Sequence, residues 1–520
     1  MIVDTPNGRI AGTTTLTKRA DVQCYLGIPF AQGPDGDFRF RPPVAPEPWE
    51  GTLDARSSGP AAPQNPDPLL AQSGFRQAHW SEHGSLTVNV WTPRADERRR
   101  PVLVWFHGGA YVSGSNSSGY NNGAELAATF EVVVVSINYR LGAFGFLNLA
   151  HVLGEGYEDS GNVGVLDMIA ALRWVAGNIE YFGGDPDRVT VFGESAGAAA
   201  VGTLLGTPAT EGLFSRAIMQ SGTAERARSQ AESEEITERF LHVAGLEPER
   251  AGELTTWSAR KLLGAQKRFA DEFAAGVIGL PLPFQPTIDG RTLHELPLDA
   301  VRRGVNSAVD LLIGTNLNEA SFFTEFAPDT VEPARSHADR LLAAVREDQL
   351  GEPETVVAEY RESVAHELGS APTDAAVLES YLSDRLYRQP SNRLLDARRS
   401  SAGSNHAYLF TWKSPMMEGR LGACHALDVP FVFRQLHRLE AVTLVGDEPP
   451  HELSDWMSAA WISFADTGRP NSAGLPVWPV YDAEERRTMR LDVDPEVLSD
   501  PRGGLRRFWA ERARVESAHV

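Results

Sequence analysis

The feature that most constrains the fold is an alternation of short apolar runs, rich in β-branched residues, with segments of helical periodicity. Continuous apolar runs of this length are typical of strands that are buried on both faces by helices. Between the second and third runs, the apolar residues of Leu166–Val175 recur at helical spacing. The sequence therefore predicts a mostly parallel sheet flanked by helices, with strands at Val102–Phe106, Val132–Ile137, Val189–Phe192, Leu311–Gly314 and Ala407–Trp412.

Two long stretches differ in composition from the rest of the chain. Residues 226–267 and 328–399 are rich in Glu, Arg, Ala and Leu and contain few β-branched runs. No Pro-rich or Gly/Ser-rich linker separates them from the neighbouring segments. We therefore expect a single domain, residues 1–520, with helical insertions near 226–267 and 328–399 that form a cap over the sheet.

The charge balance argues against two classes of partner. The 48 Lys and Arg residues oppose 69 Asp and Glu residues, which gives a net charge of −21. Such a surface repels nucleic-acid phosphates and anionic lipid headgroups, so we expect neither nucleic acid nor membrane as a partner. The start, MIVDTPNGRI, has no basic region followed by an apolar one, which favours a cytoplasmic location. Nothing in the sequence requires Cys24 and Cys424 to pair, and the oligomeric state is left open.

The strongest chemical signal follows the third apolar run. The segment Val189–Phe192 leads directly into Gly193-Glu194-Ser195-Ala196-Gly197, a G-x-S-x-G pattern, and more small residues follow. This pattern is typical of a nucleophile elbow, in which a serine occupies a sharp turn between a strand and a helix. An ordinary serine in a glycine-rich turn would also match it. The strand before and the small residues after Ser195 favour the nucleophile.

A second glycine-containing motif follows the first apolar run. His107-Gly108-Gly109-Ala110 comes directly after Val102–Phe106, and in lipases and esterases such a loop donates backbone N–H groups to an oxyanion. A simple Gly-Gly turn is the alternative. We expect an oxyanion hole made by the N–H groups of Gly108, Gly109 and Ala196.

Together with these motifs, further segments make the chain similar to the type-B carboxylesterase family, which also contains cholinesterases and para-nitrobenzyl esterases. The resemblance covers nearly the whole chain. It implies an α/β-hydrolase fold and hydrolysis of carboxylic esters. We expect no metal and no cofactor, because the sequence contains no H-E-x-x-H, P-loop or dinucleotide-binding motif. The matching segments include Gly27–Ala31, Asn89–Pro93, Asn138–Gly142, Asn178–Gly197, Gln220–Gly222 and Trp461–Phe464.

The resemblance also assigns the other members of a catalytic triad. Glu319, after Gly314–Asn316, and His425, within Cys424-His425-Ala426, match the acidic member and the histidine. Spacing alone leaves Glu325 and Asp428 open as rival acids. The resemblance further implies that Glu194 and Ser221 support the triad. Four aromatic residues are candidates for an acyl pocket, although they also fit a plain core: Phe322, Phe323, Phe431 and Phe433.

Some positions depart from the family pattern. His83, Gly84 and Ser85 stand where the family commonly has an acidic residue and a cysteine. This implies that an N-terminal disulfide is absent and that a salt bridge to Arg39 is lost. Two alanines, Ala320 and Ala426, replace the glycines after the triad Glu and His, so substrate preference does not transfer closely.

We therefore expect an enzyme that hydrolyses small to medium uncharged esters with water, through an acyl-enzyme on Ser195. Hydrolysis of carbamates or amides by the same triad is an alternative. A non-catalytic binding member of the fold is a weaker one, because the candidate nucleophile, acid and base are all present.

Overall fold

The computed structural model describes residues 1–66, 78–275, 280–326 and 336–517. Within them, the main sheet has eleven strands in the order β16-β15-β14-β13-β10-β9-β7-β8-β6-β4-β3. The strands from β15 to β8 are parallel, and the remaining strands at both edges pair antiparallel. In chain order the bounds are β3 Thr13–Leu16, β4 Asp21–Pro29, β6 Thr87–Thr92, β7 Arg100–Phe106, β8 Val133–Ile137, β9 Gly184–Glu194, β10 Arg216–Gln220, β13 Asp310–Asn316, β14 Asn405–Phe410, β15 Arg487–Leu491 and β16 Glu496–Ser499.

The five predicted strands correspond to β7, β8, β9, β13 and β14, and the predicted helix lies within α5, Val163–Asn178. Strand β10 escaped prediction because its sequence, RAIMQ, is short and begins with a charge. Strand β14 ends at Phe410, two residues before the predicted end.

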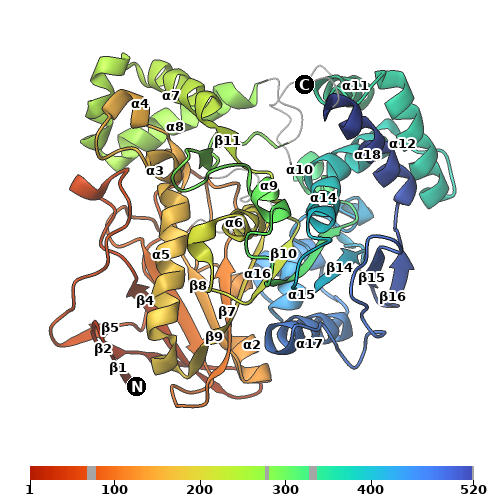
Figure 1. Ribbon diagram of the computed structural model, residues 1–520. Helices are drawn as coiled ribbons and strands as arrows, with labels where there is room; N and C mark the ends of the chain where they lie inside the picture. Colours follow the sequence, from red (N-terminus) through yellow and green to blue (C-terminus); the bar gives the residue numbers. More distant parts are fainter. Residues whose placement is uncertain (67–77, 276–279, 327–335, 518–520) are drawn as a thin grey trace.

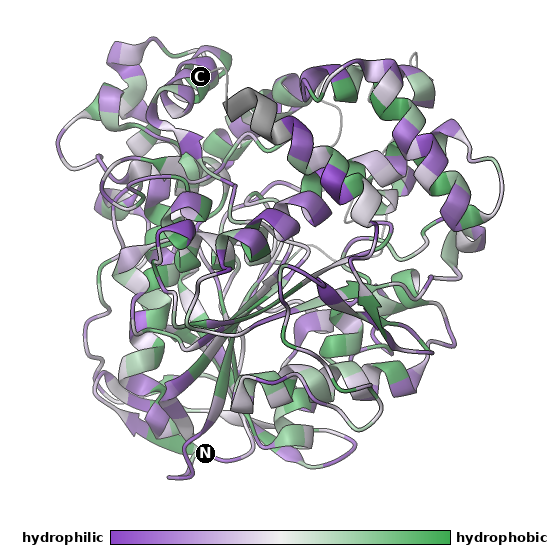
Figure 2. Cartoon of the chain, turned by 45° about the vertical axis from the view of Figure 1, so that its right-hand side comes forward, coloured by the Kyte–Doolittle hydropathy of each residue, from purple (hydrophilic) through white to green (hydrophobic). Residues whose placement is uncertain are grey.

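Each central strand contributes to a core on both faces of the sheet. Val102 and Val104 of β7 are buried in one core, whereas Leu103 and Trp105 are buried in the other. This period-two alternation places apolar residues on both faces. The first face packs against α5 and α6 (Ala196–Leu205), and the second against α2 (Ala124–Phe130) and α17 (His451–Thr467). Figure 2 shows the resulting band of hydrophobic strands between helices of mixed hydropathy.

Two groups of helices lie at one end of the sheet (Figure 1). Residues 226–267 contain α7 and most of α8, and residues 336–399 contain α11 to α14. The second group and α18 enclose a third core that includes Leu341, Tyr360, Tyr381 and Trp509. The bounds are α7 Gln230–Ala244, α8 Ala259–Ala274, α11 His337–Glu347, α12 Pro353–Leu368, α13 Asp374–Ser383, α14 Gln389–Ala397 and α18 Gly503–Ser517.

The remaining elements are short. A π-helical turn, Asp384–Arg388, joins α13 to α14.

Among the described residues, no helix is both long and apolar enough to cross a membrane. The other bounds are β1 Ile2–Thr5, β2 Gly8–Ala11, β5 Thr52–Asp54, β11 Arg228–Ser229, β12 Thr287–Ile288, α3 Gly142–Phe146, α4 Ala150–Leu153, α9 Pro297–Arg302, α10 Ser321–Phe326, α15 Val429–Val432 and α16 Leu439–Val445.

The expected loss of a salt bridge to Arg39 is wrong. Arg39 forms a bidentate ion pair with Glu82, in which Nε and Nη2 each lie 2.5 Å from a carboxylate oxygen. The acid stands one residue before His83, and both side chains are buried. Arg39 also donates to the carbonyl of Trp257, so this pair fastens the N-terminal segment to the turn before α8.

Candidate active site

Ser195 lies at the turn between β9 and α6, directly after the carboxyl end of the strand. Its φ of 57° and ψ of −123° fall in a region that L-residues rarely adopt. Its N–H donates to the carbonyl of Gln220, at the end of the neighbouring β10, at 3.0 Å. The serine therefore has the strained backbone of a nucleophile elbow, held by the adjacent strand.

The glycines on either side of Ser195 are required by close packing. A Cβ on Gly197 would collide with the carbonyl oxygen of Phe106, and one on Gly193 would collide with the backbone of Gly197. Strands β7 and β9 and helix α6 thus meet at a spacing that no larger residue permits.

The loop after β7 lies beside the serine. A Cβ built on Gly108 would be 3.2 Å from the Cβ of Ser195, and Gly109 has a φ of 108° that favours glycine. In the described part of the chain, neither glycine donates its backbone N–H to another backbone group. Ala196 is the first residue of α6, so its N–H has no acceptor within the helix. All three predicted oxyanion donors therefore lie next to Ser195 with N–H groups left available.

The side chain of His107 packs against the loop that carries Gly108 and Gly109. Its Nδ1 lies 2.8 Å from the Gly108 carbonyl, and its ring stacks on Tyr139 with centroids 4.5 Å apart. The Tyr139 hydroxyl donates to the His107 carbonyl at 2.8 Å. Burial lowers the pKa of His107 to about 4, so the ring is neutral at physiological pH and acts as a rigid support.

Glu319 and His425 form the pair that the family resemblance implied. His425 Nδ1 lies 2.6 Å from Glu319 Oε2. The other carboxylate oxygen accepts from the Ser221 hydroxyl at 2.6 Å and from the Asn316 N–H at 2.7 Å. The glutamate is fully buried. Three hydrogen bonds therefore fix this carboxylate, which in turn orients the imidazole.

The second imidazole nitrogen faces Glu194. His425 Nε2 lies 3.0 Å from Glu194 Oε1, and no hydrogen bond between His425 and the Ser195 hydroxyl is present among the described residues. Burial raises the pKa of Glu194 to about 8 although His425 opposes this. Burial would lower the pKa of His425, but Glu194 and Glu319 outweigh it and raise the pKa to about 9. The neighbouring carboxylates therefore favour the protonated imidazole, although Glu194 Oε1 and His425 Nε2 form no hydrogen bond with each other.

The rival acids are engaged elsewhere. Asp428 is fully buried and accepts hydrogen bonds from Gln220 and Tyr408, each at 2.9 Å. Glu325 forms an ion pair with Arg420. Of the three candidate acids, Glu319 is the one that contacts a nitrogen of the histidine ring.

The alanines that replace family glycines occupy different environments. Ala426 has a φ of 63°, a conformation that favours glycine, so the residue after His425 is strained. Ala320 is fully buried, and its N–H donates to the Ser383 hydroxyl at 2.9 Å.

The four candidate pocket aromatics separate into two pairs. Phe322 and Phe323 lie beside His425, with centroids 6.3 Å and 5.2 Å from its ring. Phe433 packs between Trp105 and Phe192 in the core, and Phe431 packs against Phe410 and Trp412. None of the four lines the described cavity at Ser195.

That cavity brings in residues that the sequence did not single out. Tyr387 stacks on His425 with centroids 4.6 Å apart. It also lines a cavity of about 20 Å³ next to Ser195, together with Tyr111 and Arg226. Space of this size holds about one water molecule. No local motif marks Tyr387 and Arg226, because they are distant from Ser195 in the sequence and meet it only in the folded chain.

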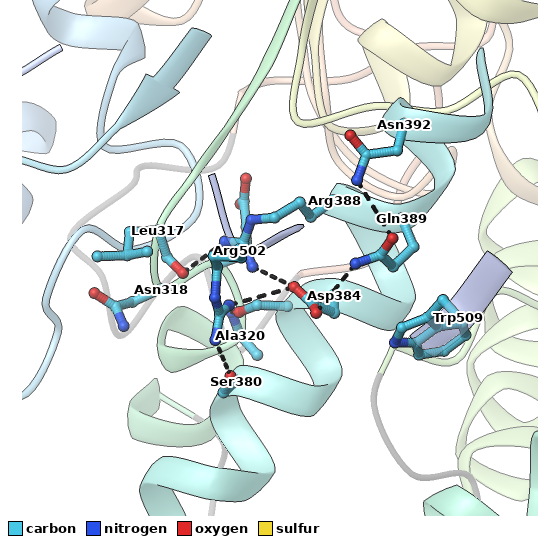
Figure 3. Close-up of polar contacts among 12 residues, drawn as sticks. Leu317, Asn318, Ala320, Ser380, Asp384, Arg388, Gln389, Asn392, Arg502 and Trp509 are labelled. Carbon is cyan, nitrogen blue, oxygen red and sulfur yellow. Dashed lines mark hydrogen bonds and ion pairs between the residues drawn. The ribbon is translucent and has the colours of Figure 1, made fainter. Parts of the chain in front are cut away.

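A charged cluster supports the loop that carries Glu319 (Figure 3). Arg388 Nη2 donates to the carbonyls of Asn316 at 3.1 Å and Leu317 at 2.8 Å. Asp384 pairs with Arg388 and with Arg502 of the C-terminal segment. Figure 3 shows both guanidinium groups directed at this carboxylate. The cluster links the π-helical turn to the end of β13, three residues before Glu319.

In the described ranges, no group of three or more His, Cys, Asp or Glu side chains is arranged to hold a metal ion. The chemistry that the site offers is that of a serine, an imidazole, carboxylates and backbone donors.

Comparison with known proteins shows which family has this sequence and fold. The model of the carboxylesterase family matches residues 1–509. The chain belongs to this family. It is 39% identical over 510 residues to the para-nitrobenzyl esterase of Bacillus subtilis strain 168, and 96% of each chain is covered. This carboxylesterase also resembles solved structures of the family.

A carboxylesterase of Geobacillus stearothermophilus superposes with a TM-score of 0.85 at 38% identity, covering 98% of this chain and 99% of the other. A PNB esterase structure superposes with a TM-score of 0.83 at 36% identity, with the same coverage. The predicted α/β-hydrolase fold and family are thereby confirmed. The protein is a carboxylic ester hydrolase.

Proposed function

We propose that the ester bond is cleaved through an acyl-enzyme, with Ser195 as nucleophile, His425 as general base and acid, and Glu319 as its orienting carboxylate. The observation that carries the proposal is the strained turn at Ser195, directly after Glu194. The Glu194 carboxylate lies 3.0 Å from His425, whose Nδ1 lies 2.6 Å from the buried Glu319. This arrangement supports a site that combines a nucleophile, a base and a group that fixes the base.

In the first half of the reaction, Ser195 Oγ adds to the ester carbonyl carbon as its proton moves to His425 Nε2. The carbonyl oxygen becomes an oxyanion, which the N–H groups of Gly108, Gly109 and Ala196 stabilise. The C–O bond to the alcohol then breaks, and the alcohol leaves with the proton from His425. In the second half, water gives a proton to His425 as its oxygen adds to the acyl carbon. The bond between the acyl carbon and Ser195 Oγ then breaks, His425 returns the proton to Ser195 Oγ, and the carboxylic acid leaves. The partners in this proposal are an ester and water, and a cytoplasmic location stays a prediction.

Substitution of the nucleophile tests the proposal. We expect Ser195→Ala to lower kcat by at least about four orders of magnitude, because no other group can form the acyl-enzyme. Release of p-nitrophenol from esters between acetate and palmitate measures this loss and the chain-length preference. Ser463→Ala is the matched control, because its hydroxyl bonds to the Arg469 carbonyl at the surface of α17.

Mass spectrometry gives an independent readout. After a rapid acid quench with p-nitrophenyl acetate, we expect one acetyl group on the peptide that contains Ser195 in the wild type and none in Ser195→Ala. Undiminished turnover by pure Ser195→Ala, or acetylation at another residue, would contradict the proposal. A greater activity on amides or carbamates than on matched esters would favour the alternative substrates while keeping the triad.

A further inference from the structure

A second cavity adjoins the one at Ser195. Its volume is about 250 Å³, against about 20 Å³ for the cavity at the serine. The two share four lining residues, Arg226, Leu280, Leu282 and Leu386. A substrate whose carbonyl lies at Ser195 therefore has space to extend past Arg226 into the larger cavity.

The larger cavity is lined by more positive than negative charge. Arg226, Arg228 and Arg385 line it together with one acid, Glu347. Arg385 is neutralised by ion pairs with Glu347 at 3.3 Å and with Asp348 at 2.8 Å. This local excess of arginine contrasts with the net charge of −21 of the whole chain.

The two remaining arginines differ in their bonding. Arg228 donates to the carbonyls of Leu282 and Pro283, both at 2.6 Å. Arg226 forms no hydrogen bond or ion pair with the described residues. Its neighbour Glu225 is bound at both carboxylate oxygens by Arg393, at 2.6 Å and 2.7 Å. Arg226 is thus the guanidinium between the two cavities whose donors are not engaged by the described protein groups.

A partly buried guanidinium that forms no hydrogen bonds has lost hydration without replacement, which costs free energy. Burial lowers the pKa of Arg226, and Tyr387 and Glu225 offset this only in part. Bonds from a bound anion would replace the water that the group has lost. A planar guanidinium matches a carboxylate in shape and charge, since both present two parallel bonding positions.

We propose that the larger cavity is a subsite for the free carboxylate of an ester substrate, with Arg226 as the residue that binds it. The substrate class is then a monoester of a dicarboxylic acid, or an ester of a hydroxy acid. This inference rests on the proposed role of Ser195. It changes the expected substrate class from uncharged esters to esters that carry one negative charge. One unengaged guanidinium balances one negative charge.

Matched pairs of esters test the subsite. Monoethyl adipate and ethyl hexanoate differ by a carboxylate on the acyl side. Acetyl γ-hydroxybutyrate and butyl acetate differ by a carboxylate on the alcohol side. Acid release in a pH-stat gives kcat/KM for each ester with wild type, Arg226→Met and Arg226→Lys. Arg302→Met is the matched control, because Arg302 is exposed on α9 and pairs there with Asp299.

In at least one pair, we expect the wild type to prefer the anionic ester and Arg226→Met to lose at least about tenfold in kcat/KM for it. The loss lies mainly in KM, because the carboxylate is bound equally before and during the reaction. The neutral partner is expected to change by less than about threefold, which also shows that the variant is folded. Arg226→Lys retains the charge and is expected to recover part of the loss.

The outcomes separate this inference from the proposed function. If the wild type hydrolyses neutral esters well but Arg226→Met changes both members of each pair alike, the subsite is wrong and the role of Ser195 stands. If Arg226→Met is inactive on all four esters, the subsite is tested instead by competitive inhibition of the wild type. Adipate, which carries carboxylates, should then inhibit more strongly than the neutral hexanamide. Inhibition by adipate that is no stronger than inhibition by hexanamide contradicts the subsite. If the wild type hydrolyses no ester, the proposed function itself fails.

Discussion

At the scale of single residues, the carboxylate of Glu194 acts on the imidazole of His425. Glu194 Oε1 lies 3.0 Å from His425 Nε2, the nitrogen that accepts the serine proton in the mechanism we propose. Glu194 and Glu319 raise the pKa of His425 to about 9, which favours the imidazolium at neutral pH. For His425 to act as the proposed base, the imidazolium must first lose its proton.

The raised pKa of His425 determines the expected pH dependence of the activity. In the proposed mechanism the deprotonated imidazole is the active form, so kcat/KM should rise with increasing pH. The midpoint of this rising limb should lie well above the ordinary pKa of a histidine. Replacing Glu194 by Gln removes a negative charge that favours the imidazolium, so the limb should move to lower pH by at least about one unit. A pH profile of kcat/KM for a neutral ester measures the shift.

A second acid serves as the control for this shift. Glu325→Gln removes the same charge from a carboxylate that pairs with Arg420 away from the imidazole, and its limb should coincide with that of the wild type. An unchanged limb in Glu194→Gln would show that the contact with His425 does not set the pKa of the base.

The residues that could be predicted from sequence are those whose role depends on near neighbours in the chain. Ser195 is recognisable because both glycines that make room for it lie two positions away. Glu319 and His425 come from loops after different strands, so spacing could not separate Glu319 from Asp428, and the family pattern supplied the assignment. Their side-chain bonds distinguish these two acids. Arg226 had no local signal at all.

At the scale of elements, the support for Glu319 is a set of contacts between helices and the end of β13. Asp384 is fully buried and accepts from the Tyr360 hydroxyl at 2.8 Å and from Gln389 at 3.2 Å, in addition to its two arginines. Burial would raise its pKa, but Arg502 and Arg388 outweigh this and lower it. The stabilisation from this carboxylate is therefore present at neutral pH and is lost as pH falls through the lowered pKa.

Asp384→Asn should destabilise the protein strongly, because it removes the counter-charge of the buried Arg388 and one of the two acids, Asp384 and Glu367, that pair with Arg502. We expect the free energy of unfolding to fall by at least about 3 kcal/mol, measured by urea denaturation. We also expect a lower kcat, because Arg388 holds the carbonyls that precede Glu319. Asp374→Asn, which breaks an exposed ion pair with Arg361, should change stability by less than about 0.5 kcal/mol. Equal effects of the two substitutions would contradict a structural role for Asp384.

The elements also show why the fold was easier to predict than its details. The strands β7, β8 and β9 are apolar on both faces, so their sequences are distinctive without further context. The edge strands, such as β3 with its TTTL sequence, have one exposed face and no comparable run. Asp384 of the π-helical turn pairs with Arg502 of the distant C-terminal segment, a contact that local periodicity cannot reveal.

At the scale of the whole molecule, two cysteines far apart in the sequence belong to the same buried region. Cys24 on β4 and Cys424, the residue before His425, are both free, fully buried members of the core on the α2 and α17 side of the sheet. Burial raises the pKa of both thiols, which disfavours the thiolate that reacts with disulfide reagents.

We expect neither thiol to react with a chromogenic disulfide reagent in the native protein, and both to react once the protein is unfolded in denaturant. If the chain is a single cooperative domain, both thiols become accessible in one step. The variants Cys24→Ser and Cys424→Ser leave one thiol each and allow the two rates to be compared. With excess reagent in moderate denaturant, both rates should equal the rate of global unfolding measured by tryptophan fluorescence. A Cys424 that reacts faster than Cys24, at a rate independent of denaturant, would show instead that the loop carrying His425 opens locally while the sheet stays folded.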